Sequence, residues 1–294
     1  MIRGLLCCAV VLTSTCALAQ APARPKIVGV AHISLKTDDL AATRNFYGHD
    51  LGFEEPFSLD KLTYFKVNDH QYIEVSPELK SQTEDRLSHI AFETTDVRQL
   101  RDYLASRGVK VPEAVQPGRD GNLSFLIQDP DGHNVEFVQY MPGSLHSKNF
   151  GKFMPATRIS THMIHVGVTV ADRDAADRLY KDILGFGEMW HGGMKDDRTD
   201  WVDMRVPEGA DWLEYMLNVH NPSPKTLGVM HHLALGVPSV ERGYKTLTAR
   251  GMQIEQPKIG RDGKWQLNLY DPNLTRCELM EPKPVQTPCC SPMK

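Results

Sequence analysis

The central part of this 294-residue sequence has almost no cysteine. Of the six cysteines, Cys277 alone falls within a segment that has a regular pattern. The others lie near the two ends of the chain, at Cys7, Cys8, Cys16, Cys289 and Cys290. A single cysteine cannot form a disulfide framework or supply the ligands of a cysteine-bound zinc ion. The sequence therefore excludes both of these ways of stabilising the folded body.

The sequence also lacks an excess of positive charge. It has 33 Lys and Arg against 37 Asp and Glu, a net charge of −4, so we expect no nucleic-acid partner and no binding to anionic membranes. With 41% hydrophobic residues the composition is that of an ordinary globular protein, which excludes disorder and collagen-like repeats. The length predicts about two domains.

The N-terminus has the three parts of a secretory signal peptide. A short positive start that includes Arg3 precedes a run of small and apolar residues over 4–15, and Ala17-Leu18-Ala19 fits the small-x-small cleavage pattern. We predict a signal peptide over residues 1–19 and an exported protein, periplasmic or extracellular. Because no later apolar run approaches the length of about eighteen residues that spans a bilayer, we expect no membrane association after cleavage.

The rest of the chain repeats one pattern four times. Four strand-like segments begin with a histidine: His32, His89, His165 and His232. Each is followed, some forty to fifty residues later, by a second strand-like segment centred on a glutamate. These are Glu74, Glu136, Glu214 and Glu278. The repeating unit therefore runs from a histidine strand to a glutamate strand.

The segments between these strands show that two units were duplicated as a pair. Gly118-Arg119-Asp120-Gly121 in the second unit matches Gly260-Arg261-Asp262-Gly263 in the fourth. Each unit predicts a strand, a helix that ends at a glycine, and about three more strands, an α+β module whose helix covers a small antiparallel sheet. The predicted domains are 26–141 (modules 26–80 and 84–141) and 162–282 (modules 162–220 and 228–282). Residues 142–161 are a linker, and 283–294 form a disordered tail.

The histidines and glutamates lie on one face of their strands. Side chains alternate across a strand, and the neighbours of His32 are the apolar Ala31 and Ile33, which we expect to pack on the helices. Two positions further along each histidine strand the residue is small, as at Ser34 and Gly167, which leaves room for a ligand. His162 and His231 point to the other face and are interpreted as structural or rim residues. The recurrence of both residue types in one register predicts at least one metal site.

These motifs resemble the vicinal oxygen chelate superfamily, which includes glyoxalase I, bleomycin and fosfomycin resistance proteins and extradiol dioxygenases. His89-Ile90-Ala91-Phe92, and the segment from Asp129 to Phe137 with Glu136 in it, are the most similar segments. The resemblance implies four βαβββ modules paired into two eight-stranded open cups, each with a divalent metal ion, which would be Zn, Ni, Co, Mn or Fe(II). It implies one ligand set of His32, Glu74, His89 and Glu136, and a second of His165, Glu214, His232 and Glu278.

Such ligand sets indicate isomerase or lyase chemistry of the glyoxalase type. Two imidazoles and two carboxylates leave an octahedral ion two positions for adjacent substrate oxygens, where the ion stabilises an enediolate. Glu136 and Glu278 are the candidates for moving the proton between neighbouring carbons. One alternative is a ring-cleaving dioxygenase with iron at His165, His232 and Glu278. A second is a binding protein of the resistance type without turnover.

Against ring cleavage, Asn268 and Leu126 stand where the extradiol signature has a tyrosine. The expected partner is a small-molecule substrate with adjacent oxygens. Trp201 and Arg205 alternate onto one face of the third module and are candidates for gripping it. We expect a monomer or a homodimer.

Overall fold

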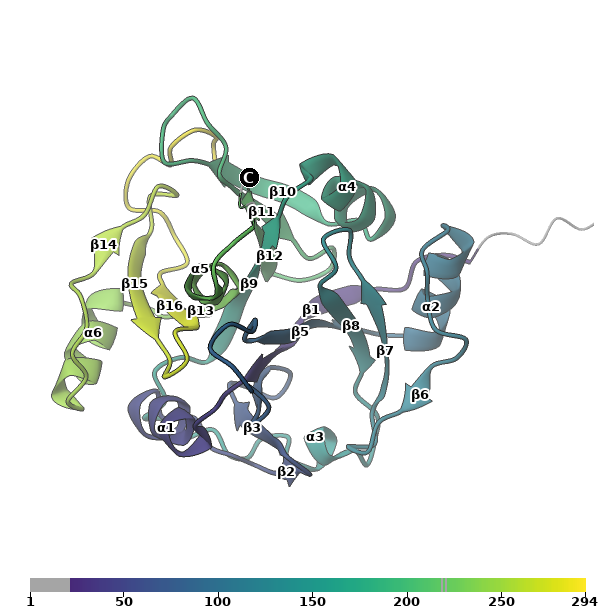
Figure 1. Cartoon of the computed structure of the whole chain (residues 1–294), viewed down its shortest axis with the longest axis horizontal. Helices are drawn as coiled ribbons and strands as arrows, with labels where there is room; N and C mark the ends of the chain where they lie inside the picture. Colours follow the sequence, from purple (N-terminus) through teal and green to yellow (C-terminus); the bar gives the residue numbers. More distant parts are fainter. Residues whose placement is uncertain (1–21, 218, 220) are drawn as a thin grey trace, which may run out of the picture.

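The computed structural model describes residues 22–217, 219 and 221–294. The predicted signal peptide lies outside the described residues. The chain forms two eight-stranded sheets, one from each half (Figure 1). In spatial order the first sheet contains β2 (Ser58–Leu59), β3 (Leu62–Lys66), β4 (Tyr72–Ser76), β1 (Ile27–Lys36), β5 (Leu87–Thr94), β8 (Asn134–Gln139), β7 (Leu123–Gln128) and β6 (Gln116–Pro117).

The second sheet repeats this order. It contains β10 (Gly187–Gly192), β11 (Trp201–Arg205), β12 (Trp212–Leu217), β9 (His162–Val170), β13 (His232–Gly236), β16 (Arg276–Met280), β15 (Trp265–Tyr270) and β14 (Lys258–Ile259). Each sheet thus joins two modules of the same half. This confirms the prediction of four βαβββ modules paired into two eight-stranded cups.

The sheet of each module is mixed, whereas we expected it to be antiparallel. The first strand of a module lies parallel to its last strand, as β1 does to β4 and β5 to β8. The two modules of a half then meet through an antiparallel pair, β1 with β5 and β9 with β13. The parallel pairs arise because a helix carries the chain over before the remaining strands turn back. These central pairs place the histidine and glutamate strands side by side.

Each module has a helix that begins at a capping side chain. Asp39, Asp96, Asp172 and Ser239 each accept a hydrogen bond from a backbone N–H in the first turn. The helices are α1 (Leu40–Arg44, continued by the π-helical η1, Asn45–Asp50), α2 (Val97–Ser106), α4 (Arg173–Asp177, continued by η2, Arg178–Ile183) and α6 (Val240–Ala249). Two further helices are α3 (Leu145–Lys148) and α5 (Pro224–Met230).

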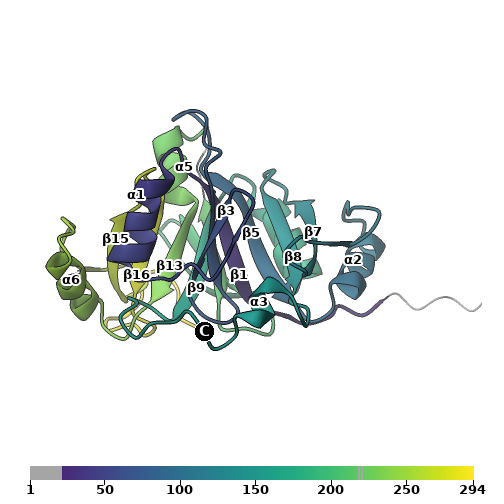
Figure 2. The ribbon, with the colours of Figure 1, turned by 90° about the horizontal axis from the view of Figure 1, so that it is seen from below.

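The two halves share one hydrophobic core. Buried apolar residues of both sheets, from Ile33 and Phe92 to Val166 and Leu235, form a single cluster. In both ribbon views α1 lies beside β15 and β16 of the other half (Figures 1 and 2). There the Tyr47 hydroxyl donates to Asp271 at 3.3 Å, and Tyr180 of the third module donates to Asp129 at 3.1 Å. The histidine faces point away from this core, and we call them the first cup (around His32) and the second cup (around His165).

The end of the chain, residues 283–294, which we predicted to be disordered, contacts the second sheet. Its backbone lies along β10, where Lys294 N–H donates to Met189 C=O at 2.9 Å and Cys289 C=O accepts from Trp190 Nε1 at 3.0 Å. Because β10 is an edge strand, the tail satisfies backbone groups that would otherwise face solvent. Cys289 and Cys290 are joined by a disulfide bond, and Cys277 is free and buried.

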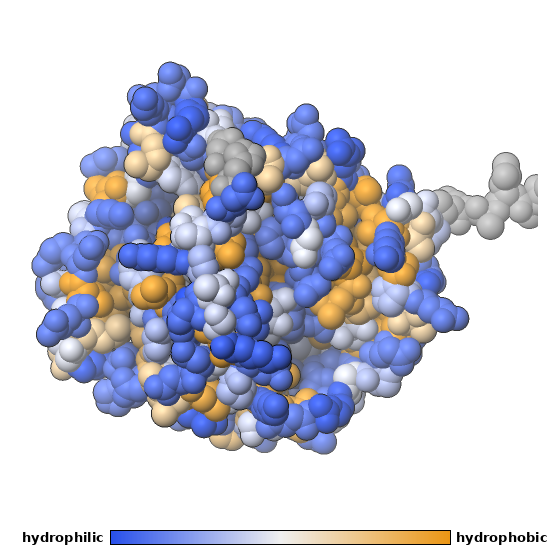
Figure 3. All heavy atoms as spheres, in the orientation of Figure 1, coloured by the Kyte–Doolittle hydropathy of each residue, from blue (hydrophilic) through white to orange (hydrophobic). Residues whose placement is uncertain are grey.

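The face of the molecule drawn in Figure 3 is mainly hydrophilic. On the face drawn in Figure 3, apolar side chains gather over β7 and β8, a region where Leu126 of β7 is 48% exposed. Among the residues that the structure describes, no helix has the length and apolar character needed to cross a membrane.

Candidate metal centre

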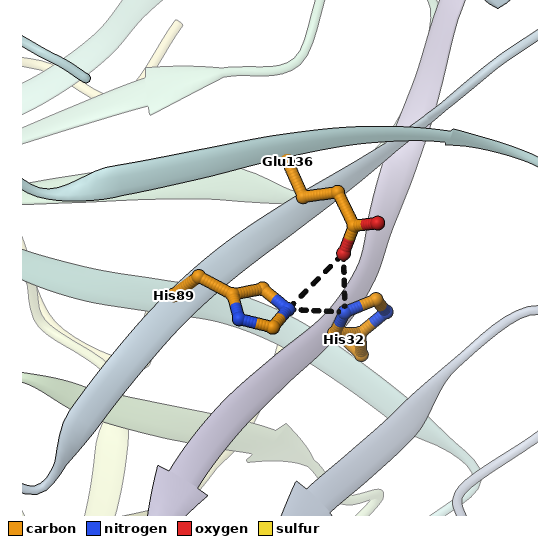
Figure 4. A group of neighbouring side chains, drawn as sticks. All are labelled: His32, His89 and Glu136. Carbon is orange, nitrogen blue, oxygen red and sulfur yellow. Dashed lines mark hydrogen bonds and ion pairs between the residues drawn. The ribbon is translucent and has the colours of Figure 1, made fainter. Parts of the chain in front are cut away.

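Three side chains of the first cup converge on one point. His32 of β1, His89 of β5 and Glu136 of β8 come from three strands that lie side by side (Figure 4). His32 Nε2 and His89 Nε2 lie 2.8 Å apart, and Glu136 Oε2 is 3.1 Å from each of them. We call this group the first-cup triad. The sheet register produces it, because residues on one face of adjacent strands stand next to each other.

The fourth predicted ligand, Glu74, lies just outside the triad. Its Oε1 accepts a hydrogen bond from Ser34 Oγ at 2.9 Å, and its Oε2 is 3.9 Å from His32 Nε2. Glu74 is buried. The structure therefore brings three of the four predicted residues together and holds the fourth close by.

The distances within the triad fit a divalent ion. Ligand atoms at adjacent corners of an octahedron, each about 2.1 Å from the ion, lie about 3.0 Å apart. The three contacts of 2.8 to 3.1 Å have this length. Two imidazoles and one carboxylate are also a common donor set for first-row divalent metals. The first-cup triad could hold such an ion, with other corners open toward the cup.

Charge in the triad follows from its contacts. Burial alone would raise the pKa of Glu136, but its hydrogen bonds to His32 and His89 outweigh burial and hold that pKa well below its usual range. Burial opposes the charged form of His32, yet Glu136 and Glu74 together raise the pKa of this imidazole. The first cup thus contains an ionised carboxylate beside its two imidazoles.

The first cup encloses a cavity of about 280 Å³ that other polar side chains also line. Tyr64, Tyr140 and His146 are among them. His146 comes from α3, inside the segment that we expected to be only a linker, and it is buried. Its Nδ1 lies 2.8 Å from Asn122 Nδ2 and 3.3 Å from Asp120 Oδ2. The sequence pattern missed His146 because nothing local shows where a connecting segment returns to the sheet.

Asp120 is the charged neighbour of His146. Burial would raise the pKa of this carboxyl, but His146 and Asn122 hold it below the ordinary value. Asp120 belongs to the Gly-Arg-Asp-Gly motif that the second and fourth modules share, so the repeat itself pointed to this loop. The Asp120–His146 pair could position a proton donor or acceptor at the cavity.

In the second cup the four predicted ligands are arranged differently. His165 Nε2 and His232 Nε2 lie 3.1 Å apart, and Glu214 Oε2 is 3.0 Å from His232 Nε2. Both Glu214 Oε2 and Glu278 Oε2 are 3.8 Å from His165 Nε2. The set His165, His232 and Glu278, expected for the dioxygenase alternative, is therefore not closely assembled.

A guanidinium group lies among these second-cup residues. Arg276 Nη2 donates to His232 Nε2 at 2.8 Å and lies 3.9 Å from Glu214 Oε2. Burial, with Arg276 and other cations nearby, lowers the pKa values of His165 and His232 well below the usual range. Burial also raises the pKa of Glu278 to about 7, with Glu214 and Asp262 adding to the shift and Arg276 opposing it.

The two predicted substrate residues have different positions. Trp201 lines the second-cup cavity, which has a volume of about 300 Å³ and also contains Asp203. Arg205 is exposed and donates to the C=O of Lys294 at 2.8 Å, away from this cavity. Arg205 therefore contacts the tail and does not line this cavity, and its role as a substrate residue stays a prediction.

His162 and His231, which we interpreted as structural or rim residues, lie outside the first-cup triad and outside the four predicted ligands of the second cup. His231 Nδ1 is 2.9 Å from Asp85 of the first half, and its Nε2 is 3.0 Å from Thr169 Oγ1. His162 contacts Asp211. These histidines connect elements at the junction of the halves.

Two family models match the chain, one over residues 29–137 and one over 164–269. Both describe the glyoxalase/bleomycin resistance protein/dioxygenase superfamily. Among curated proteins, the chain is 25% identical to lactoylglutathione lyase of Neisseria meningitidis over 38% of this chain and 91% of that protein. It is 24% identical to glyoxalase I of Saccharomyces cerevisiae over 33% of this chain, and the match spans only 27% of the yeast protein.

Solved structures share the fold. Homoprotocatechuate 2,3-dioxygenase from B. fuscum superposes with a TM-score of 0.67 at 20% identity, covering 88% of this chain and 72% of that one. The Mn(II)-bound glyoxalase from Novosphingobium aromaticivorans gives a TM-score of 0.69 at 18% identity, covering 88% of this chain and 83% of that one. At these identities the similarity establishes the architecture of paired modules.

Proposed function

The chain belongs to the glyoxalase/bleomycin resistance protein/dioxygenase superfamily, and we propose that it is a divalent-metal-dependent lyase or isomerase of the glyoxalase type. Its active site is the first cup. The observation that supports this most is the first-cup triad, whose three ligand atoms lie within 3.1 Å of one another beside a cavity of about 280 Å³. The substrate class is a small molecule with two adjacent oxygen atoms.

The triad residues and Glu74 have separate roles in this proposal. His32, His89 and Glu136 would hold the ion, which would be Mn, Fe(II), Co, Ni or Zn from the donor types. When bound, the ion would supply a Lewis acid that stabilises negative charge on the adjacent substrate oxygens. From the sequence Glu136 was the candidate for proton transfer, but its Oε2 contacts both imidazoles. Glu74 is better placed as the base, because it is close to the triad without belonging to it.

Glu74 would move the proton between the two neighbouring carbons of the substrate. Ser34 Oγ–H donates to Glu74 Oε1 and fixes the carboxylate, which leaves Oε2 as the atom that takes and returns the proton. His146, oriented by Asp120, lines the same cavity and would hydrogen-bond the substrate or its departing group. The buried walls limit water at the reacting carbons.

The test is turnover of metal-loaded protein on a panel of thiol adducts of 2-oxo aldehydes. The panel includes the adduct that yields lactoylglutathione, the compound named in the Neisseria relative. We expect conversion of at least one adduct, abolished by His89→Ala and by a chelator. Metal-loaded protein that binds these adducts without converting any of them would instead support the binding-protein alternative.

Ring cleavage by an iron oxygenase is the second candidate. It is favoured by the composition of the first-cup triad, since two histidines and one carboxylate are the donors of non-haem Fe(II) oxygenases. Its site would be the first cup and not the second, where Glu278 is 3.8 Å from His165. Oxygen uptake by Fe(II)-loaded protein with catechols distinguishes the two reactions, because an isomerase consumes no oxygen.

We also propose that the protein is exported, on the basis of the N-terminal pattern over residues 1–19. Expression of the full chain in a bacterial host, followed by mass spectrometry of the periplasmic fraction, tests this. A mature protein that begins at Gln20 supports export, and an unprocessed cytoplasmic chain contradicts it.

A further inference from the structure

We propose that Arg276 occupies the second cup in place of a metal ion, so that this cup is a latent metal site that opens when the guanidinium is removed. The inference is independent of the proposed activity, because it concerns the cup that takes no part in it. It depends on contacts in the second cup and on a residue-by-residue comparison of the two cups.

The hydrogen bonds of His232 show why a metal ion is excluded. Its Nδ1 is 2.8 Å from the C=O of Met230, and because a carbonyl only accepts, Nδ1 must carry the proton. The lone pair of this neutral imidazole is therefore on Nε2. Arg276 Nη2 donates to that atom at 2.8 Å. A guanidinium that cannot lose its proton and a metal ion cannot both use this lone pair.

The sheet registers identify the counterpart of Arg276 in the first cup. Glu136 is paired with Leu126, and Glu278 is paired with Asn268, so the two glutamates are equivalent. Two residues before them stand Asn134 and Arg276. Asn134 is exposed and its Nδ2 donates to the C=O of Ser88 at 3.2 Å, away from the triad. An uncharged side chain in the first cup is thus replaced by a cation in the second.

A second cation is introduced in the same way. Asn122 and Lys264 are equivalent, since each backbone N–H donates to the aspartate two residues earlier at 3.1 Å. Lys264 is 2% exposed, and its Nζ lies 3.4 Å from Asp262 and 4.6 Å from the centre of the Trp212 ring. The second cup therefore contains buried positive charges of its own, which compensate the carboxylates that a metal ion would otherwise neutralise.

The acids of the two cups differ correspondingly. Tyr64 is paired with Glu74 in the first sheet, and at the same place Asp203 is paired with Glu214 in the second. Asp203 is buried, and it adds a carboxylate where the first cup has a phenol. Arg276 and Lys264 thus lie among a larger number of buried acidic side chains than the first cup has. This is expected when the side chains of arginine and lysine take the place of a bound metal ion.

Glu214, the second-cup equivalent of Glu74, lacks the serine hydrogen bond that holds Glu74 in place. Ser34 holds Glu74, whereas its equivalent Gly167 has no side chain. A Cβ at Gly167 would lie 2.0 Å from His232 Cε1, so the glycine makes room for this ring. Untethered, Glu214 Oε2 approaches His232 Nε2 to 3.0 Å. With Arg276 gone, His165, His232 and Glu214 would keep a donor set of the same kind as the first-cup triad.

Equilibrium dialysis of the full-length chain against Mn²⁺, with metal content measured by mass spectrometry, tests the inference. Mn²⁺ suits this test because it prefers nitrogen and oxygen ligands over sulfur ligands. Arg276→Asn, which installs the first-cup residue, should bind one ion more than the unmodified chain, and Arg276→Lys, which keeps a cation, should bind no additional ion. Arg276→Gln provides a second neutral variant if the asparagine variant does not fold.

The same variants in a His89→Ala background separate the cups. His89→Ala alone should bind no ion, and His89→Ala with Arg276→Asn should bind one. If the unmodified chain binds none while Arg276→Asn gains one, the metal proposal for the first cup fails and the inference stands. An ion retained by His89→Ala with Arg276 present, or no gain in folded Arg276→Asn and Arg276→Gln, would overturn the inference.

Discussion

Binding of a metal ion at the first-cup triad should raise the thermal stability of the whole chain by a calculable amount. A ligand that binds only the folded state, present at 100 times its Kd, stabilises that state by about 2.7 kcal/mol. The change in Tm depends on how many residues unfold together. Since the apolar residues of both sheets form one cluster, we expect both halves to unfold as one unit.

The number of residues that unfold together determines the size of the change in Tm. With an unfolding entropy of about 2.1 cal/mol/K per residue, a unit of ~270 residues has roughly 0.57 kcal/mol/K, and 2.7 kcal/mol raises Tm by ~5 °C. If the first half unfolded alone, with its ~113 residues, the same stabilisation would raise Tm by ~11 °C. Differential scanning calorimetry with and without Mn²⁺ measures the shift. The matched control is Glu136→Gln, which keeps the shape of the side chain but removes the charge that contacts both imidazoles.

We expect a single transition that moves by ~5 °C in the unmodified chain and by less than ~1 °C in Glu136→Gln at the same Mn²⁺ concentration. Equal shifts in both proteins would refute the assignment of the first-cup triad as the metal site. Two resolved transitions, with the upper one unaffected by Mn²⁺, would refute the single unfolding unit.

Three further outcomes are expected. Glu74→Gln should retain the ion and lose turnover by about 10² to 10⁴-fold, whereas Glu136→Gln should lose the ion as well, as metal analysis beside a rate assay shows. Burial raises the pKa of Asp271 to about 6, so the folded state binds this proton more tightly than the unfolded state. The free energy of unfolding should therefore fall by up to ~3 kcal/mol as the pH rises from about 4 to 6. Urea titrations should show this fall in the unmodified chain and not in Asp271→Asn. Gly167→Ala should destabilise the chain by ~1–3 kcal/mol through contact with the His232 ring, and a Tm unchanged from the unmodified protein would contradict the packing at that strand.

Much of the fold could be predicted because the four modules repeat a strong local signal. The histidine and glutamate strands alternate between an apolar and a polar face, and the register of such strands determines which residues share a cup. His32, His89 and Glu136 therefore meet as the repeat indicated. The glycine that ends each of the helices η1 and η2 also has the positive φ that its turn needs, +78° at Gly52 and +82° at Gly185.

What the sequence did not reveal depends on contacts between distant segments. His146 enters the first cup from a connecting segment, and its place there is set by packing against Tyr140 and Asp120. Arg276 precedes Glu278 by two residues and so lies on the same face of the strand. The strand pattern thus places a cation near the ligands, but it does not show that the guanidinium contacts His232. The tail packs on β10 because an edge strand is available, which no local pattern announces.

The most direct test of the account is a crystal structure of the chain grown with Mn²⁺, with anomalous diffraction recorded to locate the ion. The account predicts one strong anomalous peak, within about 2.3 Å of His32 Nε2, His89 Nε2 and a Glu136 carboxylate oxygen, with Arg276 still bonded to His232 in the other cup. A peak between His165, His232 and Glu214, or none at the first-cup triad, would contradict it.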